Sequence, residues 1–159
     1  MEYEHILGAT DFSPLGNQAL QRAANLAAEA GCRLTALTVL PQPEMPSPLL
    51  AHYDLEKNDA KEAQARIAAR EALLEAIPAS VREGELQIEC EVLVGDPAGE
   101  ILSADLRLRP DLIVLATHGR RGWRRWIMGS VAERVVQMAH ADVLTVRERG
   151  TEADAPEEG

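Results

Sequence analysis

The sequence predicts an α/β fold in which a doubly wound parallel sheet carries helices on both faces. Three short runs, at 5–9, 34–40 and 112–116, are apolar at nearly every position. Such runs are typical of strands buried on both faces of a parallel sheet. Segments with the helical spacing of apolar residues alternate with them along the chain. In folds of this kind, ligands bind beyond the carboxyl ends of the strands, where the strand order reverses.

The first helix is predicted directly after the strand at 5–9. The Ser13 hydroxyl can cap a helix N-terminus, and Pro14 is favoured at the first helical position. Gly31 is typical of a position just past a helix C-terminus. Between these signals the apolar residues recur every three or four positions, at Leu15, Ala19, Ala23, Leu26 and Ala27. This spacing predicts a helix with one buried face.

The middle of the chain continues the alternation. A proline-rich stretch at 41–48 predicts an irregular loop after the second strand. The segment 55–77 is rich in Ala, Glu, Leu, Arg and Lys and predicts a long helix. A weaker strand is expected at 86–94, and Asp96 followed by Pro97 provides a second helix start.

The last third of the chain holds the strand at 112–116, a helical pattern after Gly129 and Ser130, and a short apolar strand at 143–146. The predicted order of elements is therefore β-α-β-α-β-α-β-α-β. Loops after the first and fourth strands, if these strands are neighbours, would face one another across a crevice.

Composition narrows the class of protein. The chain has 159 residues, a hydrophobic content of 46% and a net charge of −10. These values predict one globular domain at 1–147, followed by an acidic tail at 148–159 that we expect to be disordered. The acidic balance argues against general nucleic-acid binding. No secretory signal or membrane-length apolar run is found, so we expect a cytoplasmic protein whose cysteines, Cys32 and Cys90, are free buried thiols.

One loop, at 116–130, concentrates positive charge and glycine in this acidic chain. Its arginines are Arg120, Arg121, Arg124 and Arg125, its glycines are Gly119, Gly122 and Gly129, and it holds both tryptophans, Trp123 and Trp126. The loop ends at a predicted helix N-terminus, where unpaired backbone N–H groups carry partial positive charge. Glycines allow close backbone approach and arginines add charged hydrogen bonds, so the loop suits a polyphosphate.

Other interpretations of this loop are open at the level of sequence. Ser130 and Glu133 have the spacing of a capping box, in which each satisfies the helix end. The arginines can equally form a solvated patch, and the tryptophans can anchor a surface loop. His118 can contact a ligand or have a structural role in the loop, and His5 is expected to be structural.

Several common site types are absent from the sequence. No P-loop motif is present, and the two lysines, Lys57 and Lys61, both lie in the helix predicted at 55–77. No G-x-G-x-x-G motif follows the first strand, and no serine lies in a G-x-S-x-G elbow. No histidine has metal-ligand spacing with Cys, Asp or Glu. We therefore name no catalytic residue and no metal ligand.

Three segments together resemble the universal stress protein family. They are TDFSP, VGDPAGEIL and DLIVLATHGRRGWRRWIMGSVAERVVQMAHADVLTVR, and the resemblance covers about residues 3–147. ATP-binding members carry G-x-x-G, nine residues, then G-[ST]. Here the frame reads Ala116-Thr-His-Gly119, nine residues, Gly129-Ser130, so alanine replaces the first glycine. If position 116 needs positive φ, its methyl group is costly; if it only ends the strand, alanine is small enough.

The resemblance implies a Rossmann-like, five-stranded sheet in the order 3-2-1-4-5 and a site for ATP, with Mg²⁺. By similarity, Ala9, Thr10 and Asp11 line the adenosine pocket, and Val39 contacts the adenine. Residues Ala116, His118, Gly119, Arg120, Arg121, Gly122, Gly129, Ser130 and Val131 form the phosphate side of the expected site. Asp11 can alternatively be a turn residue ahead of Ser13.

The resemblance also implies a homodimer, through antiparallel pairing of the last strands, and no nucleic-acid or membrane partner. Three functions are compatible with these features. The first is a stress regulator whose conformation or partners depend on bound nucleotide. The second is a slow ATPase or self-phosphorylating protein, for which no general base is placed. The third is a dimeric interaction module that binds no nucleotide.

Overall fold

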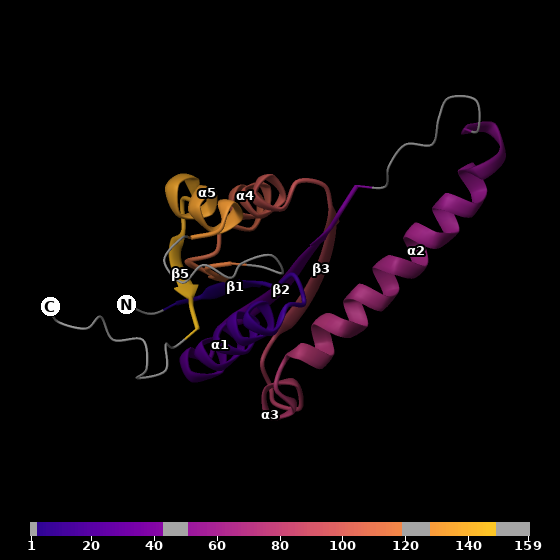
Figure 1. Ribbon diagram of the computed structural model, residues 1–159. Coiled ribbons are helices and arrows are strands. Elements are labelled where there is room, and N and C mark those ends of the chain that lie inside the picture. Colours follow the sequence, from indigo (N-terminus) through magenta and orange to yellow (C-terminus); the bar gives the residue numbers. More distant parts are fainter. Residues whose placement is uncertain (1–2, 43–50, 119–127, 149–159) are drawn as a thin grey trace, which may run out of the picture.

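The computed structural model describes residues 3–42, 51–118 and 128–148, with the backbone alone described over 51–58. Strands and helices alternate along the chain (Figure 1). Their bounds are β1 His5–Ala9, α1 Pro14–Ala30, β2 Arg33–Leu40, α2 Ala51–Ala76, α3 Ala79–Arg82, β3 Ile88–Val94, α4 Pro97–Leu108, β4 Leu112–Ala116, α5 Ser130–Met138 and β5 Asp142–Val146.

The strands form a parallel sheet in the order β3-β2-β1-β4-β5, which confirms the predicted fold class and strand order. β1 lies at its centre, and Ile6 is opposite Leu34 on one side and Leu112 on the other. The chain leaves β1 toward β2 and returns later to β4, so the order reverses between β1 and β4. The carboxyl ends of these two strands therefore flank the switch point at which ligands bind in such folds.

Helices cover both faces of the sheet. α1 and α2 lie on one face, and α4 and α5 lie on the other (Figure 1). Consecutive strand residues alternate between the two faces. Ile6 and Val114 thus join the core beneath α1 and α2, whereas Leu7 and Ile113 join the core beneath α4 and α5.

The predicted starts of α1 and α4 are confirmed. Ser13 is the N-cap of α1, and its Oγ accepts the Gly16 N–H at 3.0 Å. Asp96 is the N-cap of α4, and its Oδ2 accepts the Gly99 N–H at 2.9 Å. α1 ends at Ala30, and Gly31 follows it, as expected, with a left-handed backbone at φ 65°.

The helix predicted at 55–77 is confirmed as one continuous helix, α2, although its ends differ. α2 begins earlier, at Ala51, and ends at Ala76, and a separate short helix, α3, follows Pro78. Proline has no backbone N–H to donate, so it ends α2 and starts α3. The strand expected at 86–94 begins only at Ile88, while those expected at 34–40 and 143–146 each start one residue earlier.

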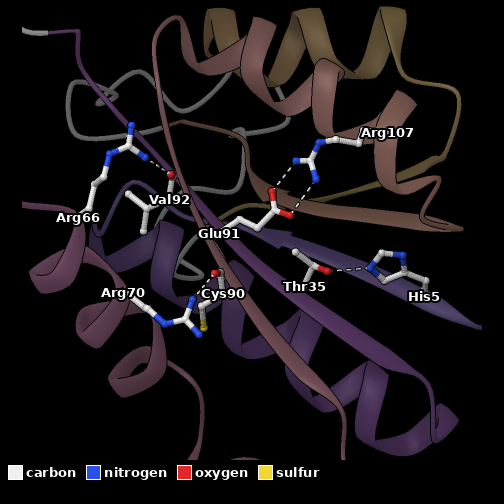
Figure 2. A network of polar contacts seen from close by, with 8 residues as sticks. All are labelled: His5, Thr35, Arg66, Arg70, Cys90, Glu91, Val92 and Arg107. Carbon is white, nitrogen blue, oxygen red and sulfur yellow. Dashed lines mark hydrogen bonds and ion pairs between the residues drawn. The ribbon is translucent and has the colours of Figure 1, made fainter. Parts of the chain in front are cut away.

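His5 has the structural role expected for it. Its side chain is 3% exposed and lies against β2 (Figure 2). An arginine can only donate, so Arg33 Nη2 donates to His5 Nδ1 at 2.9 Å, and His5 Nε2 donates to Thr35 Oγ1 at 2.8 Å. This arrangement needs the neutral ring. Burial, and secondly the Arg33 charge, lower the pKa of His5.

Both cysteines are free and buried, as predicted. Cys32 precedes β2 and is 7% exposed, and Cys90 lies in β3 and is 8% exposed. Burial raises the pKa of both thiols. The thiolate is the reactive form of cysteine, so neither thiol is placed for nucleophilic chemistry.

Candidate functional site

A cavity of about 160 Å³ opens at the carboxyl ends of β1, β2 and β4. It lies at the switch point between β1 and β4. The helices α1, α4 and α5 contribute residues from the first five positions of each helix. Apolar side chains form most of its wall. The residues that line it are Ala9, Thr10, Asp11, Gly16, Leu37, Val39, Pro97, Ile101, Leu115, Ala116, His118 and Val131.

The loop between β1 and α1 is held in shape by Asp11. Its Oδ1 accepts the Ser13 N–H at 3.0 Å and the Ser13 hydroxyl at 2.5 Å. Between them, Phe12 adopts a left-handed backbone with φ 62°, which is uncommon for a residue other than glycine. Asp11 is therefore a turn residue, and it also lines the cavity. The two interpretations of Asp11 at the sequence level are compatible in the structure.

The same loop is tied to the end of β2. The Thr38 hydroxyl donates to the Thr10 carbonyl at 2.7 Å, and the Thr10 N–H donates to the Leu37 carbonyl at 3.0 Å. The Thr10 hydroxyl donates to Asn17 Oδ1 in α1 at 3.0 Å. These bonds hold one wall of the cavity rigidly against β2 and α1.

Gly16 lets this loop pack against the first turn of α1. A Cβ atom at position 16 would lie 2.5 Å from Asp11 Oδ1 and 2.9 Å from Thr10 Oγ1. Real Cβ atoms do not approach other atoms so closely, so a side chain here would displace the turn. Gly16 lines the cavity and is absent from the site predicted from the sequence.

Ala116 is an ordinary strand residue. It is the last residue of β4 and pairs with Val146 of β5. Among the described residues other than glycine, only Phe12 and Arg109 have positive φ. Alanine therefore strains nothing at position 116, and its methyl group contributes to the cavity wall. Position 116 therefore does not need the positive φ that would favour glycine.

Two polar atoms beyond the end of β4 are buried without a hydrogen-bond partner within the described part of the chain. They are Thr117 Oγ1 and His118 Nδ1. Thr117 is 8% exposed, and His118 lines the cavity. Leaving a buried polar atom unpaired costs roughly 1–3 kcal/mol. A buried polar atom without a partner is rare and requires an explanation, and a bound water, ion or polar ligand would supply one.

The capping box expected at Ser130 and Glu133 is wrong. The N-cap of α5 is Gly129, Ser130 is the first helical residue, and no side chain caps this helix end. The reason is tertiary: the Gly129 N–H donates to the Thr117 carbonyl at 2.6 Å, which fixes where the helix starts. The amide groups of the first turn of α5 thus lack the side-chain acceptor that a cap would supply.

Gly129 lies close to the end of β4. A Cβ atom at position 129 would lie 3.1 Å from the Thr117 carbonyl oxygen and 3.4 Å from the His118 Cα. The absence of a side chain therefore allows α5 to begin directly beside β4. On the far side, Arg134 Nη1 donates to Asp96 Oδ2 at 2.7 Å, which joins α5 to the N-cap of α4.

The structure brings together seven of the residues predicted for the site, all on the cavity wall. They are Ala9, Thr10, Asp11, Val39, Ala116, His118 and Val131. Gly129 and Ser130 lie at the start of α5 and outside this lining. The predicted residues Gly119, Arg120, Arg121 and Gly122 lie outside the described residues, as do both tryptophans.

Sequence reasoning missed five residues of the lining: Gly16, Leu37, Pro97, Ile101 and Leu115. Leu37 and Leu115 belong to strands that were predicted, and Pro97 and Ile101 belong to the VGDPAGEIL segment. The sequence pattern therefore predicts the segments that hold these four residues. It does not show that Pro97 and Ile101 reach the cavity, because this depends on how α4 packs on the sheet.

Comparison with known proteins agrees with this architecture. The model of the universal stress protein family matches residues 2–147. The chain belongs to the universal stress protein family. A universal stress protein of Methanocaldococcus jannaschii is 34% identical over 146 residues, which cover 91% of this chain and 82% of that protein. The structure of the universal stress protein UspA of Lactobacillus plantarum matches with a TM-score of 0.73 and 29% identity, over 92% of this chain and 99% of that one.

Two further solved universal stress proteins are complexes with nucleotides. One, in complex with cAMP, matches with a TM-score of 0.58 and 24% identity, over 92% of this chain and 98% of that one. The other, from Archaeoglobus fulgidus in complex with dAMP, matches with a TM-score of 0.59 and 21% identity, over 92% and 99%. At these identities the likeness to this universal stress protein shows a shared fold.

None of the helices in the described ranges is both long and apolar enough to cross a bilayer. Over the same ranges, no group of three or more His, Cys, Asp or Glu side chains is arranged to hold a metal ion.

Proposed function

We propose that this universal stress protein binds an adenine nucleotide, ATP with Mg²⁺, in the cavity at the switch point. The observation that carries the proposal is the pairing of an apolar cavity with unsatisfied polar groups at its rim. The apolar wall is continuous with the start of α5, whose first turn has no side-chain cap. Thr117 and His118 lie beside Gly129 at the start of α5, and their Oγ1 and Nδ1 atoms lack partners among the described residues.

The base of the nucleotide would occupy the cavity. Its volume of about 160 Å³ is smaller than the roughly 300–1,000 Å³ of pockets that enclose drug-sized ligands. A planar base would fit against Val39 and Ile101, while the rest of the nucleotide would extend outward. Asp11, at the cavity wall, would accept hydrogen bonds from ribose hydroxyls or from the adenine.

The phosphates would then lie at the N-terminus of α5. Its uncapped amide groups, at Ser130 and Val131, point partial positive charge at this position. Gly129 permits close approach of the backbone, and Gly119, Arg120, Arg121 and Gly122 would add donors and charge. The Mg²⁺ ion would enter with the phosphates and neutralise part of their charge.

The solved complexes with cAMP and dAMP support an adenine nucleotide as the class of ligand. We infer that occupancy of the site regulates conformation or partner choice, as expected of a stress regulator. No lysine lies in the loop at 116–130 to support phosphoryl transfer. A slow ATPase or self-phosphorylating activity is therefore the weaker alternative.

We also propose a homodimer formed through β5. This strand is an edge of the sheet because it pairs with β4 alone. The Val146 carbonyl accepts from Thr117 and the Asp142 N–H donates to Asp111, so even-numbered residues of β5 face β4. The backbone groups of Val143 and Thr145 face outward, where a second copy of the strand can pair with them.

A nucleotide titration tests the proposed ligand. Trp123 and Trp126 are the only tryptophans and flank the proposed phosphate position in sequence. We expect intrinsic fluorescence to change saturably when ATP and Mg²⁺ are added, and GTP to bind more weakly. Calorimetry on the same samples serves as an independent readout. Lack of a saturable signal in both measurements at millimolar ATP would leave the dimeric module without nucleotide as the better account.

A further inference from the structure

The two edges of the sheet differ in how their backbone groups are covered. At the β3 edge, the Gln87 carbonyl accepts the Leu34 N–H, and the Gly95 N–H donates to the Leu40 carbonyl. Backbone groups alternate in direction along a strand, so the odd-numbered residues of this stretch face β2. The even-numbered residues direct their N–H and C=O groups to the open side.

Two arginines of α2 bind the outward carbonyl groups of β3. Arg66 Nη1 donates to the Val92 carbonyl at 3.0 Å, and Arg70 Nη1 donates to the Cys90 carbonyl at 2.8 Å (Figure 2). Residues four apart on a helix are about 6.0 Å apart along its axis, and residues two apart on a strand are about 6.6 Å apart. The two spacings match, so one helix face can cap successive outward carbonyls.

Other contacts hold these arginines in place. Arg66 also donates from Nε and Nη2 to Glu62 Oε1, at 3.2 and 3.0 Å, so its guanidinium group is fixed from both sides. The part of α2 that carries Arg70 is anchored by buried Ala69 and Leu73. An added strand would lie about 4.8 Å from β3, and the guanidinium nitrogens already occupy that space.

The opposite layer secures the same strand. Arg107 of α4 donates from Nη1 and Nη2 to the two carboxylate oxygens of Glu91, which lies between Cys90 and Val92 (Figure 2). At the β5 edge the situation differs. Within the described ranges, no hydrogen bond reaches the outward backbone groups of Val143 or Thr145.

We propose that Arg66 and Arg70 close the β3 edge of the sheet to strand addition by a second copy of this chain. The inference does not depend on nucleotide binding. It predicts that opening the β3 edge gives the sheet a second place to grow, and that association then continues beyond a closed assembly.

The double variant Arg66→Ala/Arg70→Ala tests the proposal. We expect light scattering after size exclusion to show wild-type protein at one mass over a wide concentration range. The double variant is expected to grow to larger, concentration-dependent masses. The matched control is Arg22→Ala/Arg82→Ala, which removes the same charge from arginines that are exposed in α1 and α3.

A folded double variant that keeps the wild-type mass at every concentration would overturn the proposal. Growth of the control to the same extent would overturn it too, because charge loss alone would then explain the result. Circular dichroism and thermal unfolding establish that each variant is folded. If the pair of substitutions prevents folding, the single variants decide: each frees one carbonyl, and folded single variants with unchanged mass also count against the proposal.

Discussion

At the scale of single residues, Asp11 shows how one side chain serves both fold and site. One of its oxygens accepts two hydrogen bonds from Ser13, and the residue lines the cavity. The sequence alone left open whether Asp11 is a turn residue or a binding residue, because TDFSP is compatible with both. Resolving this required the tertiary contacts of the loop with β2 and α1.

Two substitutions at Asp11 separate these roles. Asp11→Asn keeps an acceptor for the Ser13 N–H and removes the charge. We therefore expect its free energy of unfolding to lie within about 1 kcal/mol of the wild-type value. Its affinity for ATP should fall roughly tenfold or more, because a hydrogen bond to a charged group contributes about 1.5–3 kcal/mol. Asp11→Ala should lose stability as well as affinity. Urea unfolding and calorimetry measure the two effects, and wild-type affinity in Asp11→Asn would show that the charge has no part in binding.

His5 makes the stability of the fold depend on pH. Its pKa is lowered in the folded state, from an ordinary value of 6.5, first by burial and then by Arg33. The unfolded chain therefore takes up a proton more readily than the folded chain. The stabilising contribution is complete above pH 6.5 and is lost as the pH falls toward the folded pKa.

We expect the free energy of unfolding to decrease between pH 7.5 and 5, and His5→Gln to flatten this dependence. Glutamine cannot take up a proton and can still donate to Thr35. His140→Gln is the control, because the His140 side chain is 74% exposed. Urea unfolding at several pH values measures the slope. An unchanged slope in His5→Gln, or an equal loss of slope in the control, would contradict this account.

At the scale of elements, the strands and most helix starts were predictable from the sequence, but the start of α5 was not. The Ser13-Pro14 and Asp96-Pro97 signals are local, and both helices begin where these signals place them. Ser130 has an equally good N-cap signal in the sequence. In the structure, however, Gly129 is the N-cap of α5 and Ser130 is its first helical residue. The hydrogen bond between Gly129 and Thr117 decides this start, and no local pattern reports a bond between segments twelve residues apart.

The difference between the two serines gives a direct test. Ser13→Ala removes an N-cap acceptor, and we expect it to cost about 0.5–2 kcal/mol of stability. Ser130 is the first helical residue without a capping bond, so Ser130→Ala should change stability by less than about 0.5 kcal/mol. Urea unfolding of the two variants compares them under the same conditions. A cost for Ser130→Ala as large as that for Ser13→Ala would restore the capping box.

The short helix α3 illustrates a second limit of sequence reasoning. It has four residues, too few for a helical period to show, and it follows Pro78, which is a breaker by local rules. Likewise, the apolar spacing of 55–77 does not reveal that Arg66 and Arg70 reach the carbonyls of β3. Such contacts depend on where α2 lies along the edge of the sheet.

At the scale of the whole molecule, alternation of strands and helices was sufficient to predict a doubly wound parallel sheet. The order of the strands came from the resemblance to universal stress proteins, because alternation alone is compatible with several orders. The order in turn determines the site: β1 and β4 are neighbours, so Asp11, after β1, and His118, after β4, line the same cavity. Ile101 and Pro97 complete the cavity from α4, which only the packed structure shows.

The cavity at the switch point is proposed to hold the base of an adenine nucleotide. Calorimetric titration of ATP with Mg²⁺ into wild type, Ala116→Leu and Ala63→Leu tests this placement of the base. Ala116 lines the cavity at the end of β4, so leucine there would fill it, whereas Ala63 is exposed on α2. We predict saturable binding by wild type and by Ala63→Leu, and affinity reduced at least about 100-fold, or roughly 2.7 kcal/mol, in Ala116→Leu. Equal binding by a folded Ala116→Leu variant, or none by wild type, would contradict the account.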